Sequence, residues 1–421
     1  VQGGEGGSGN GGHGIFCSSV LNITTSGKIV KAQGGAGKSG GGHGIHSGNF
    51  FSISSGEITQ AAGGASTDGT GGHGIYSRQY LGISGGTIET AQGGAGKSGG
   101  NGIHSDDYLY IFGTAEGTAK IETAQGGSGI AAGGAGIYSK GDLTIEGSTI
   151  GKWKIDSKNN QIPDTDTGAL GGDASAGAQG GHGIYSDGQL FISNNAAIWN
   201  AKGGDGKGTD GTGGSGIHSA GQLTINTGII KNAQGGEGKT TGGSGIYVDT
   251  LNIISGIIKK AIGGRSTGEG GTGGEGIASV KDLTISDGTI EEATGGDADS
   301  GSGGSGIHSD SNLTISGSAE IDSATGGSGK NGGAGISAGT KSSEDVIITI
   351  SGGTIGKAIG NDGGAGIGGS AGQRSHVEIT DGTIKKAEGK NGGAGIGGGR
   401  GAGATVTISG GTIGSWDRAT Q

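Results

Sequence analysis

Proline, cysteine and methionine are almost missing from this chain, and each absence excludes something. Of 421 residues one is proline (Pro163), one is cysteine (Cys17) and none is methionine. Collagen needs abundant proline and a glycine at every third residue, so the 115 glycines do not form a collagen helix. A single cysteine allows no disulfide within the chain. Because the sequence starts at Val1, we expect a processed protein or an excised region, with any signal peptide or anchor outside it.

Large apolar side chains are also scarce. Aromatic residues make up 4% of the chain, and no apolar run is long enough to cross a bilayer, so we expect no membrane span. Glycine at this density opposes helix, because each interior glycine costs about 1 kcal/mol relative to alanine. The net charge of −10 and the scattered lysines offer no basic track for a nucleic acid, so we expect no nucleic-acid partner.

What the chain does have is a repeat of about thirty residues. Each unit starts with a Gly-Ile pair, and a fixed period of this size predicts a solenoid of stacked units. The isoleucines of the pair are Ile15, Ile45, Ile75, Ile103, Ile137, Ile184, Ile217, Ile246, Ile277, Ile307, Ile336, Ile367 and Ile396.

Within a unit, apolar and polar residues alternate, which is typical of short strands. Leu143 and Ile145, for example, flank Thr144, and Leu313 and Ile315 flank Thr314. We therefore predict an all-β protein, a parallel β-helix or β-solenoid of about 13 coils with right-handed connections and a glycine-rich face. At about 4.8 Å per coil the stack would be roughly 60 Å long. The glycine-rich side is expected to pack backbone against backbone.

A third column of isoleucines is followed three residues later by a small inward residue. Alanine fills this slot in most units, and Trp153 and Trp416 are read as exceptions. We expect a single solenoid domain over residues 1–421, with coils that carry rings in 1–325, glycine-richer coils in 326–421, and an insertion loop near 155–178. That insertion accounts for the 47-residue spacing between Ile137 and Ile184.

The position after each Gly-Ile isoleucine points outward and is mostly a ring. Such a strip could bind glycans, because sugar faces lie on aromatic rings, or the rings could simply stack to stabilise the sheet. The two interpretations stay open at this point. The strip, which we call the ring strip, comprises Phe16, His46, Tyr76, His104, Tyr138, Tyr185, His218, Tyr247 and His308.

Metal ligands are the next possibility. His13, His43 and His73 precede the Gly-Ile pair on consecutive units, so their imidazoles could share a metal. Asp164 and Asp166 lie in a D-T-D-T-G stretch of the insertion and could hold calcium. No carboxylate or cysteine column accompanies the histidines, so we expect neither a metal nor a cofactor.

Catalytic residues are not apparent. Cys17 falls in a column otherwise filled by serines such as Ser47 and Ser77, so it reads as a small-residue substitution. Parallel β-helices also include polysaccharide lyases and hydrolases, but these need carboxylates on adjacent coils. The column three residues after the isoleucine, with Asp106, Lys140 and Asp187, does not supply them. We predict that the protein is not an enzyme.

The later units, S-G-G-T-I-G-K-A-I-G-N-D-G-G-A-G-I-G-G-S and D-G-T-I-K-K-A-E-G-K-N-G-G-A-G-I-G-G-G, resemble the glycine-rich repeats of large bacterial cell-surface and adhesin-like proteins. The resemblance implies a secreted, stalk-like or adhesive role outside the cell. The first and last units show no capping helix, so head-to-tail self-association is expected. The sequence thus favours a building block or shaft of an extracellular fibre. The alternatives are an adhesin segment that binds glycans or a host surface through the ring strip, and a polysaccharide-degrading enzyme.

Overall fold

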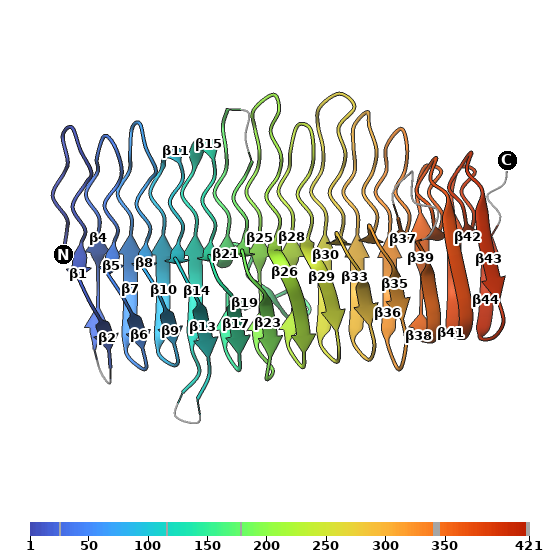
Figure 1. The fold of residues 1–421 in the computed structure, drawn as a ribbon, viewed down its shortest axis with the longest axis horizontal. Coiled ribbons are helices and arrows are strands. Elements are labelled where there is room, and N and C mark those ends of the chain that lie inside the picture. The colour runs from blue at the N-terminus through green and yellow to red at the C-terminus, as the bar shows by residue number, and fades with distance from the viewer. Residues whose placement is uncertain (25–26, 115–116, 177–178, 340–345, 418–421) are drawn as a thin grey trace. The chain divides into compact units, whose positions relative to one another are not determined.

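The computed structural model describes residues 1–24, 27–114, 117–176, 179–339 and 346–417. These residues form an all-β solenoid of about 13 coils, built on a parallel sheet, and they include no helix. The predicted fold class is confirmed. The coils divide into two compact units, which we call unit 1 (Val1–Gly221 and Ile230–Asn232) and unit 2 (Gln222–Ile229 and Ala233–Gln421). Figure 1 shows the strands of successive coils side by side within each unit.

Each coil of unit 1 has three strand positions, most of them only two to six residues long. The first position holds β1 (Ile15–Cys17), β5 (Ile45–Ser47), β8 (Ile75–Ser77), β12 (Ile103–Ser105), β16 (Ile137–Ser139) and β22 (Ile184–Ser186). The second holds β2 (Leu21–Ile23), β6 (Phe51–Ile53), β9 (Leu81–Ile83), β13 (Leu109–Phe112), β17 (Leu143–Glu146) and β23 (Leu190–Ser193). The third holds β3 (Lys28–Ile29), β4 (Ala32–Gln33), β7 (Glu57–Ala62), β10 (Thr87–Gln92), β14 (Lys120–Gln125), β18 (Thr149–Ile150), β21 (Gly168–Leu170), β24 (Ala197–Ile198) and β25 (Ala201–Lys202).

Unit 2 repeats the pattern with some longer strands. Its strands are β28 (Ala233–Gln234), β29 (Ile246–Ile253), β30 (Ile257–Ile262), β31 (Ile277–Ser279), β32 (Leu283–Ile285), β33 (Thr289–Thr294), β34 (Ile307–Ser309), β35 (Leu313–Ile315), β36 (Glu320–Thr325), β37 (Ile336–Ala338), β38 (Ile348–Ile355), β39 (Ala358–Gly360), β40 (Ile367–Gly368), β41 (Ser375–Gly389), β42 (Ile396–Gly397), β43 (Ala404–Ile408) and β44 (Thr412–Asp417). Two further strands, β26 (Ile217–Asn226) and β27 (Ile229–Ile230), contain residues of both units.

The predicted columns coincide with the register of the strands. In unit 1 the Gly-Ile isoleucines pair Ile15 with Ile45 and Ile45 with Ile75, and in unit 2 Ile277 pairs with Ile307. The isoleucines at the centre of each unit are fully buried, so each column forms a continuous apolar row of identical residues. The thin isoleucine, leucine and alanine core is thereby confirmed.

The glycine-rich side of each coil is packed by backbone alone. Gly64 donates its N–H to the carbonyl oxygen of Gly42 at 2.7 Å, and Gly72 donates to Gly64 at 2.8 Å, so hydrogen bonds zigzag from coil to coil. A Cβ on Gly64 would lie 1.9 Å from the carbonyl oxygen of Gly35, which leaves room for no other residue type. These segments form the upper part of the coils in Figure 1, drawn mostly as loops, which we call the glycine lobe. The predicted backbone packing is confirmed. A short parallel pair, β11 (Gly96–Ser98) with β15 (Gly129–Ala132), lies in this lobe.

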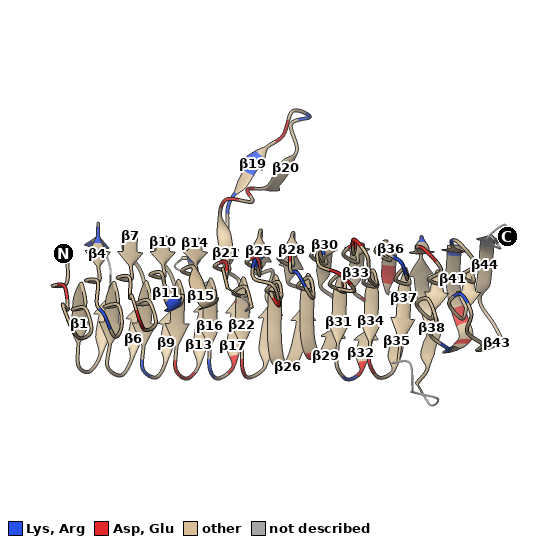
Figure 2. Cartoon of the chain, turned by 90° about the horizontal axis from the view of Figure 1, so that it is seen from above, with Lys and Arg blue, Asp and Glu red and all other residues tan. Residues whose placement is uncertain are grey.

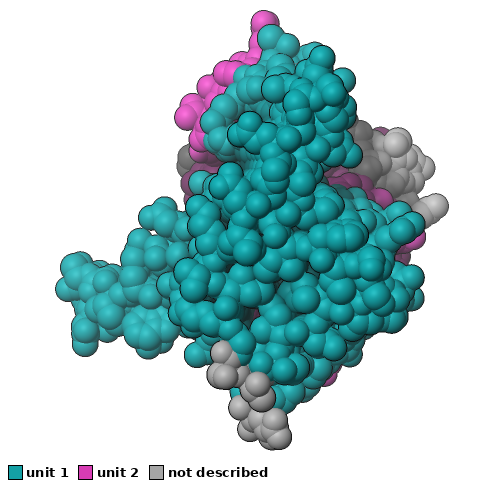
Figure 3. Space-filling model, turned by 90° about the vertical axis from the view of Figure 1, so that its left-hand side faces the viewer, with its two compact units in different colours: residues 1–221, 230–232 teal, residues 222–229, 233–421 magenta. Residues whose placement is uncertain are grey.

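The insertion differs from its prediction. The chain leaves the coil after Gly151 and rejoins it at Gly168, and the residues between form an antiparallel hairpin of β19 (Trp153–Ile155) and β20 (Gln161–Pro163). The hairpin projects from the coils in Figure 2, and the same arm stands out from the teal surface of unit 1 in Figure 3. Assigning Trp153 to the inward alanine slot was wrong, because Ala169 pairs with Ala124 and with Ala201 and fills that slot. The backbone of Trp416 does pair with Ala387, as the repeat predicts.

Candidate functional site

The ring strip is real, and its rings lie on one another. The first strand of each coil holds one ring between an inward isoleucine and an inward serine, so parallel pairing brings each ring beside the next. In unit 1 the centroids of successive rings lie between 4.6 Å (His104 to Tyr138) and 5.3 Å (Tyr76 to His104). At such separations neighbouring rings are in contact; His104 and Tyr138 are stacked, and the other successive pairs are tilted or meet edge to face. The rings of the strip in unit 1 therefore pack against one another.

Aspartates three residues after the isoleucine tie the rings together. Asp106 accepts the Tyr76 hydroxyl and lies 2.9 Å from Nε2 of His104, and Asp187 accepts the Tyr138 hydroxyl at 2.6 Å. The hydrogen bond to His104 lowers the pKa of Asp106 to about 2. Burial, together with the bond to Asp187, raises the pKa of Tyr138. The scattered acids of this column thus act as acceptors for the rings.

In unit 2 the ring strip is shorter. Tyr247 is 37% exposed, and its partner on the next coil is Ala278, which is buried. Ala278 pairs in turn with His308. After His308 the column continues as Ser337, Gly368 and Gly397. The strip ends near residue 310, as the sequence predicts.

The histidines before the Gly-Ile pair form a ladder of hydrogen-bond acceptors. Nδ1 of His13 accepts the backbone N–H of His43 at 3.0 Å, and Nδ1 of His43 accepts the N–H of His73 at 2.9 Å. Asn101 takes over the role on a later coil, where its Oδ1 accepts the N–H of Ala135 at 2.7 Å, and His182 accepts the N–H of Ser215 at 2.9 Å. Each of these side chains satisfies a backbone donor of the next coil.

Burial lowers the pKa of these histidines, so they are neutral in the folded protein. The pKa of His43 and of His182 falls to about 3, and that of His73 lies well below its usual value. In a neutral imidazole whose Nδ1 accepts a hydrogen bond, Nε2 must carry the ring hydrogen. The hydrogen-bond ladder therefore fixes the tautomer of each ring.

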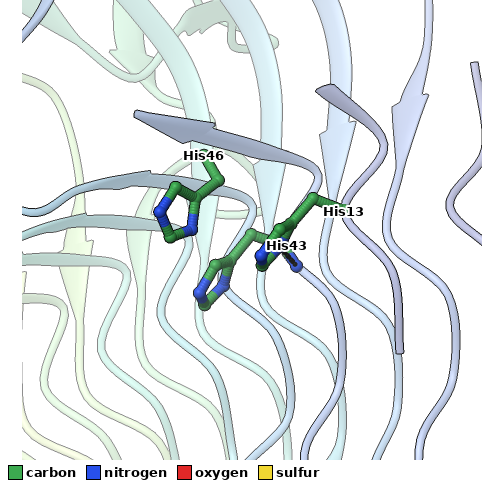
Figure 4. A group of neighbouring side chains, drawn as sticks. All are labelled: His13, His43 and His46. Carbon is green, nitrogen blue, oxygen red and sulfur yellow. Dashed lines mark hydrogen bonds between the residues drawn. The ribbon is translucent and has the colours of Figure 1, made fainter. Parts of the chain in front are cut away.

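Three imidazoles come close enough to raise the question of a metal. One ring nitrogen from each of His13, His43 and His46 lies within 4.8 Å of the others, and Nδ1 of His46 is buried without a partner. Figure 4 shows the three rings side by side. The rings of His13 and His43 are stacked at 4.9 Å and only 10° apart, so their lone pairs do not converge. A metal on Nε2 would also displace the ring hydrogen to Nδ1, where the backbone N–H already points. The predicted third member, His73, stacks on His43 at 4.9 Å rather than joining this group.

The proposed calcium ligands do not gather. Oδ1 of Asp164 lies 3.3 Å from Nζ of Lys154 across the hairpin, and Asp166 is exposed in the turn before β21. Apart from the three histidines, the described part of the chain brings no three histidine, cysteine or carboxylate side chains within metal-binding range.

Cys17 occupies the serine column, as predicted. It pairs with Ser47, and its Sγ lies 3.3 Å from the carbonyl oxygen of Val20. The serines make the same contact: Ser47 donates to the oxygen of Phe50 at 2.7 Å and Ser77 to that of Tyr80 at 2.9 Å. The column closes the turn that follows the first strand.

One cluster was missed by the sequence reasoning. His308 lies 2.8 Å from Oγ of Ser337 through Nδ1 and 2.9 Å from Oδ1 of Asp310 through Nε2. Burial raises the pKa of the adjacent Glu275 to about 7. Burial alone would lower the pKa of His308, but the carboxyl groups of Asp310 and Glu275 outweigh it and raise that pKa.

This connectivity is that of a nucleophile, base and acid triad. However, Ser337 is fully buried and also donates to Oγ of Ser305 at 3.0 Å, so its hydroxyl faces protein rather than solvent. The positions of Glu275, His308, Asp310 and Ser337 on adjacent coils could have indicated the cluster from the sequence. The pKa values of Glu275 and His308 could not, because they depend on burial.

No family model, curated protein or solved structure matches this chain. Among the described residues there is also no helix that is long and apolar enough to span a membrane.

Proposed function

We propose that this chain is a non-enzymatic, secreted structural protein, a building block or shaft of an extracellular fibre in which β-solenoid coils stack head to tail. One observation carries the proposal. Within each unit, successive coils pair in register through the same residues, as in Ile15 with Ile45, Ile45 with Ile75 and Ile277 with Ile307, so the ladder of one coil is complementary to another coil of the same kind. A ladder of this kind accepts a further coil, whether from the same polypeptide or from another copy.

The state of the titratable groups supports a non-enzymatic role. The aspartates of the ring strip accept hydrogen bonds from tyrosine and histidine, and the ladder histidines accept backbone donors. Ser337, the nearest approach to a nucleophile, is fully buried. A polysaccharide lyase or hydrolase would need its acid and base free to reach a substrate.

An adhesin segment is the second candidate, and it rests on the resemblance to glycine-rich cell-surface repeats. The contacts between successive rings, 4.6 to 5.3 Å apart, favour packing within the strip over a platform for sugars. An extracellular or cell-surface location belongs to both candidates and comes from the resemblance alone.

Negative-stain electron microscopy and light scattering over a concentration series test the fibre. We expect particles that lengthen with concentration, and we expect Ile408→Lys to prevent growth by placing a charge on the ladder of β43, where Ile408 is 54% exposed. Val280→Lys, at a 37% exposed position away from that ladder, is the matched control and should leave growth unchanged. Particles of constant length at high concentration, or growth that survives Ile408→Lys, would refute assembly through this edge.

A further inference from the structure

A groove of about 520 Å³ lies at the base of the hairpin of unit 1. Its lining includes Trp153 and Trp199, which are two of the three tryptophans in the chain. In a protein with so few aromatic residues, two tryptophans on one surface groove call for an explanation. Packing of the core does not supply one, because Trp153 is 47% exposed and Trp199 is only partly buried.

The repeat shows that Trp199 is not needed by the coil. It follows the inward Ile198, and the same outward position carries Glu122 after Ile121 and Lys231 after Ile230. Polar and charged residues therefore serve the fold at this position. The tryptophan is a departure from the column rather than part of it.

Gly151 opens space beside Trp199. It holds the same outward position on the preceding coil, has a φ of +89° and carries no side chain. A Cβ there would lie 3.1 Å from Cβ of Trp199 and 3.2 Å from Cα of Gly168, so the position favours glycine. Glu122 and Trp199 line the groove on either side of Gly151, so the gap between their side chains spans two coil spacings. Two spacings amount to about 9.6 Å, enough for one flat ring in contact with the indole.

One charged group lies over a face of the Trp199 indole, and others form the rim of the gap between Trp199 and Glu122. Nζ of Lys231, on the following coil, lies 5.2 Å from the ring centroid of Trp199, which leaves the side toward Gly151 for a ligand. On the opposite wall Nζ of Lys152 lies 2.5 Å from Oε2 of Glu122, and Lys120 lies beside them. Trp153, at the foot of the hairpin, borders the same space.

We propose that this groove binds the pyranose rings of an oligosaccharide. The apolar C–H face of a pyranose would stack on Trp199, and its hydroxyls would exchange hydrogen bonds with Glu122 and Lys152. An apolar peptide fits less well, because the wall opposite the indole is an ion pair. A nucleic acid is opposed by the net charge of −10. The site does not depend on fibre formation, since all its residues belong to unit 1, whereas β43 and β44 belong to unit 2.

Tryptophan fluorescence titrations test the site, with hexasaccharides of β-1,4-linked glucose, of N-acetylglucosamine and of galacturonate as probes. We expect at least one probe to saturate a change in emission. Trp199→Thr, which installs the residue found as Thr59 in this column, and Trp153→Ser should each weaken binding about tenfold or more, measured by calorimetry. Phe191→Thr is the matched control, because Phe191 lies at another outward position of unit 1 that pairs with Thr144.

A second variant guards against a folding artefact. Removing residues 152–167 and joining Gly151 to Gly168 deletes the hairpin while keeping the coil, so circular dichroism should be retained and binding lost. Absence of binding by every probe at millimolar concentration would overturn the proposal, as would binding that both tryptophan variants leave unchanged. Filament growth by the tryptophan variants should equal that of the wild type, so this result is separable from the test of assembly.

Discussion

Lowering the pH from about 7 to about 5 is expected to destabilise the fold through His43 and His182. Nδ1 of each ring accepts a backbone N–H of the next coil, so protonation would turn an acceptor into a donor that faces another donor. Burial lowers the pKa of both rings to about 3. For His43 the neighbouring His13, His46 and His104 lower it further, while Asp106 raises it.

The direction of the effect follows from proton binding. Below the ordinary histidine pKa of 6.5 the unfolded chain takes up protons that the folded protein does not. The stability is therefore fully present above pH 6.5 and falls as the pH is lowered toward 3. One pKa unit corresponds to about 1.4 kcal/mol, so each of the two histidines should remove about 2 kcal/mol at pH 5.

Asparagine provides the matched variant, because Asn101 performs the same role in this column without titrating at these pH values. Urea unfolding at the two pH values should show that His43→Asn and His182→Asn each lose about 2 kcal/mol less than the wild type on acidification. Comparing variants removes the contributions of other groups, including His308, whose raised pKa acts in the opposite sense. Equal pH dependence in the wild type and both variants would refute the acceptor role, as would imidazolium signals of His43 or His182 in the folded protein at pH 5 by NMR.

Two further predictions concern the glycine lobe and the buried acid of unit 2. Gly64→Ala should prevent folding of the adjacent coils, because the added Cβ would lie 1.9 Å from a carbonyl oxygen. The effect would be seen as lost protection of backbone amides from hydrogen exchange. Gly7→Ala, where nothing lies within 4 Å of the added Cβ, is the control, and equal protection in both variants would contradict the packing. Glu275→Gln keeps a hydrogen-bond acceptor but removes a carboxylate whose pKa is raised by burial from 4.5 to about 7. At pH 8 the variant should therefore have a free energy of unfolding about 1–3 kcal/mol higher than the wild type, and at pH 4 this gain should vanish. A gain that is independent of pH would argue against burial of this charge.

The columns could be predicted from the sequence because each coil pairs in register with the next. Once Ile15, Ile45 and Ile75 are known to share a phase, parallel stacking fixes what surrounds them. The column of hydrogen-bond acceptors before the Gly-Ile pair could also have been recognised from the sequence. His73, Asn101 and Glu275 differ in shape and charge, but each side chain carries an acceptor atom.

The hairpin and the cluster around His308 could not be predicted in the same way. After Ile150 the spacing alone favours Trp153 for the inward slot, and only the complete coil shows that the chain returns with Ala169. The pKa values of Glu275 and His308 are set by burial and by side chains from neighbouring coils, which a repeat pattern does not encode. The groove of Trp153 and Trp199 likewise joins residues that are separated by the hairpin.

The coil-to-coil pairing has a mechanical consequence. Because the strands of a coil pair with those of its two neighbours, tension along the stacking direction would act mainly on one ladder at a time rather than on the whole domain. A coil of roughly 30 residues that detached would release about 100 Å of extended chain, given about 3.4 Å per residue. A shaft built this way would lengthen in equal steps under load and absorb work at each step, as a sacrificial tether does.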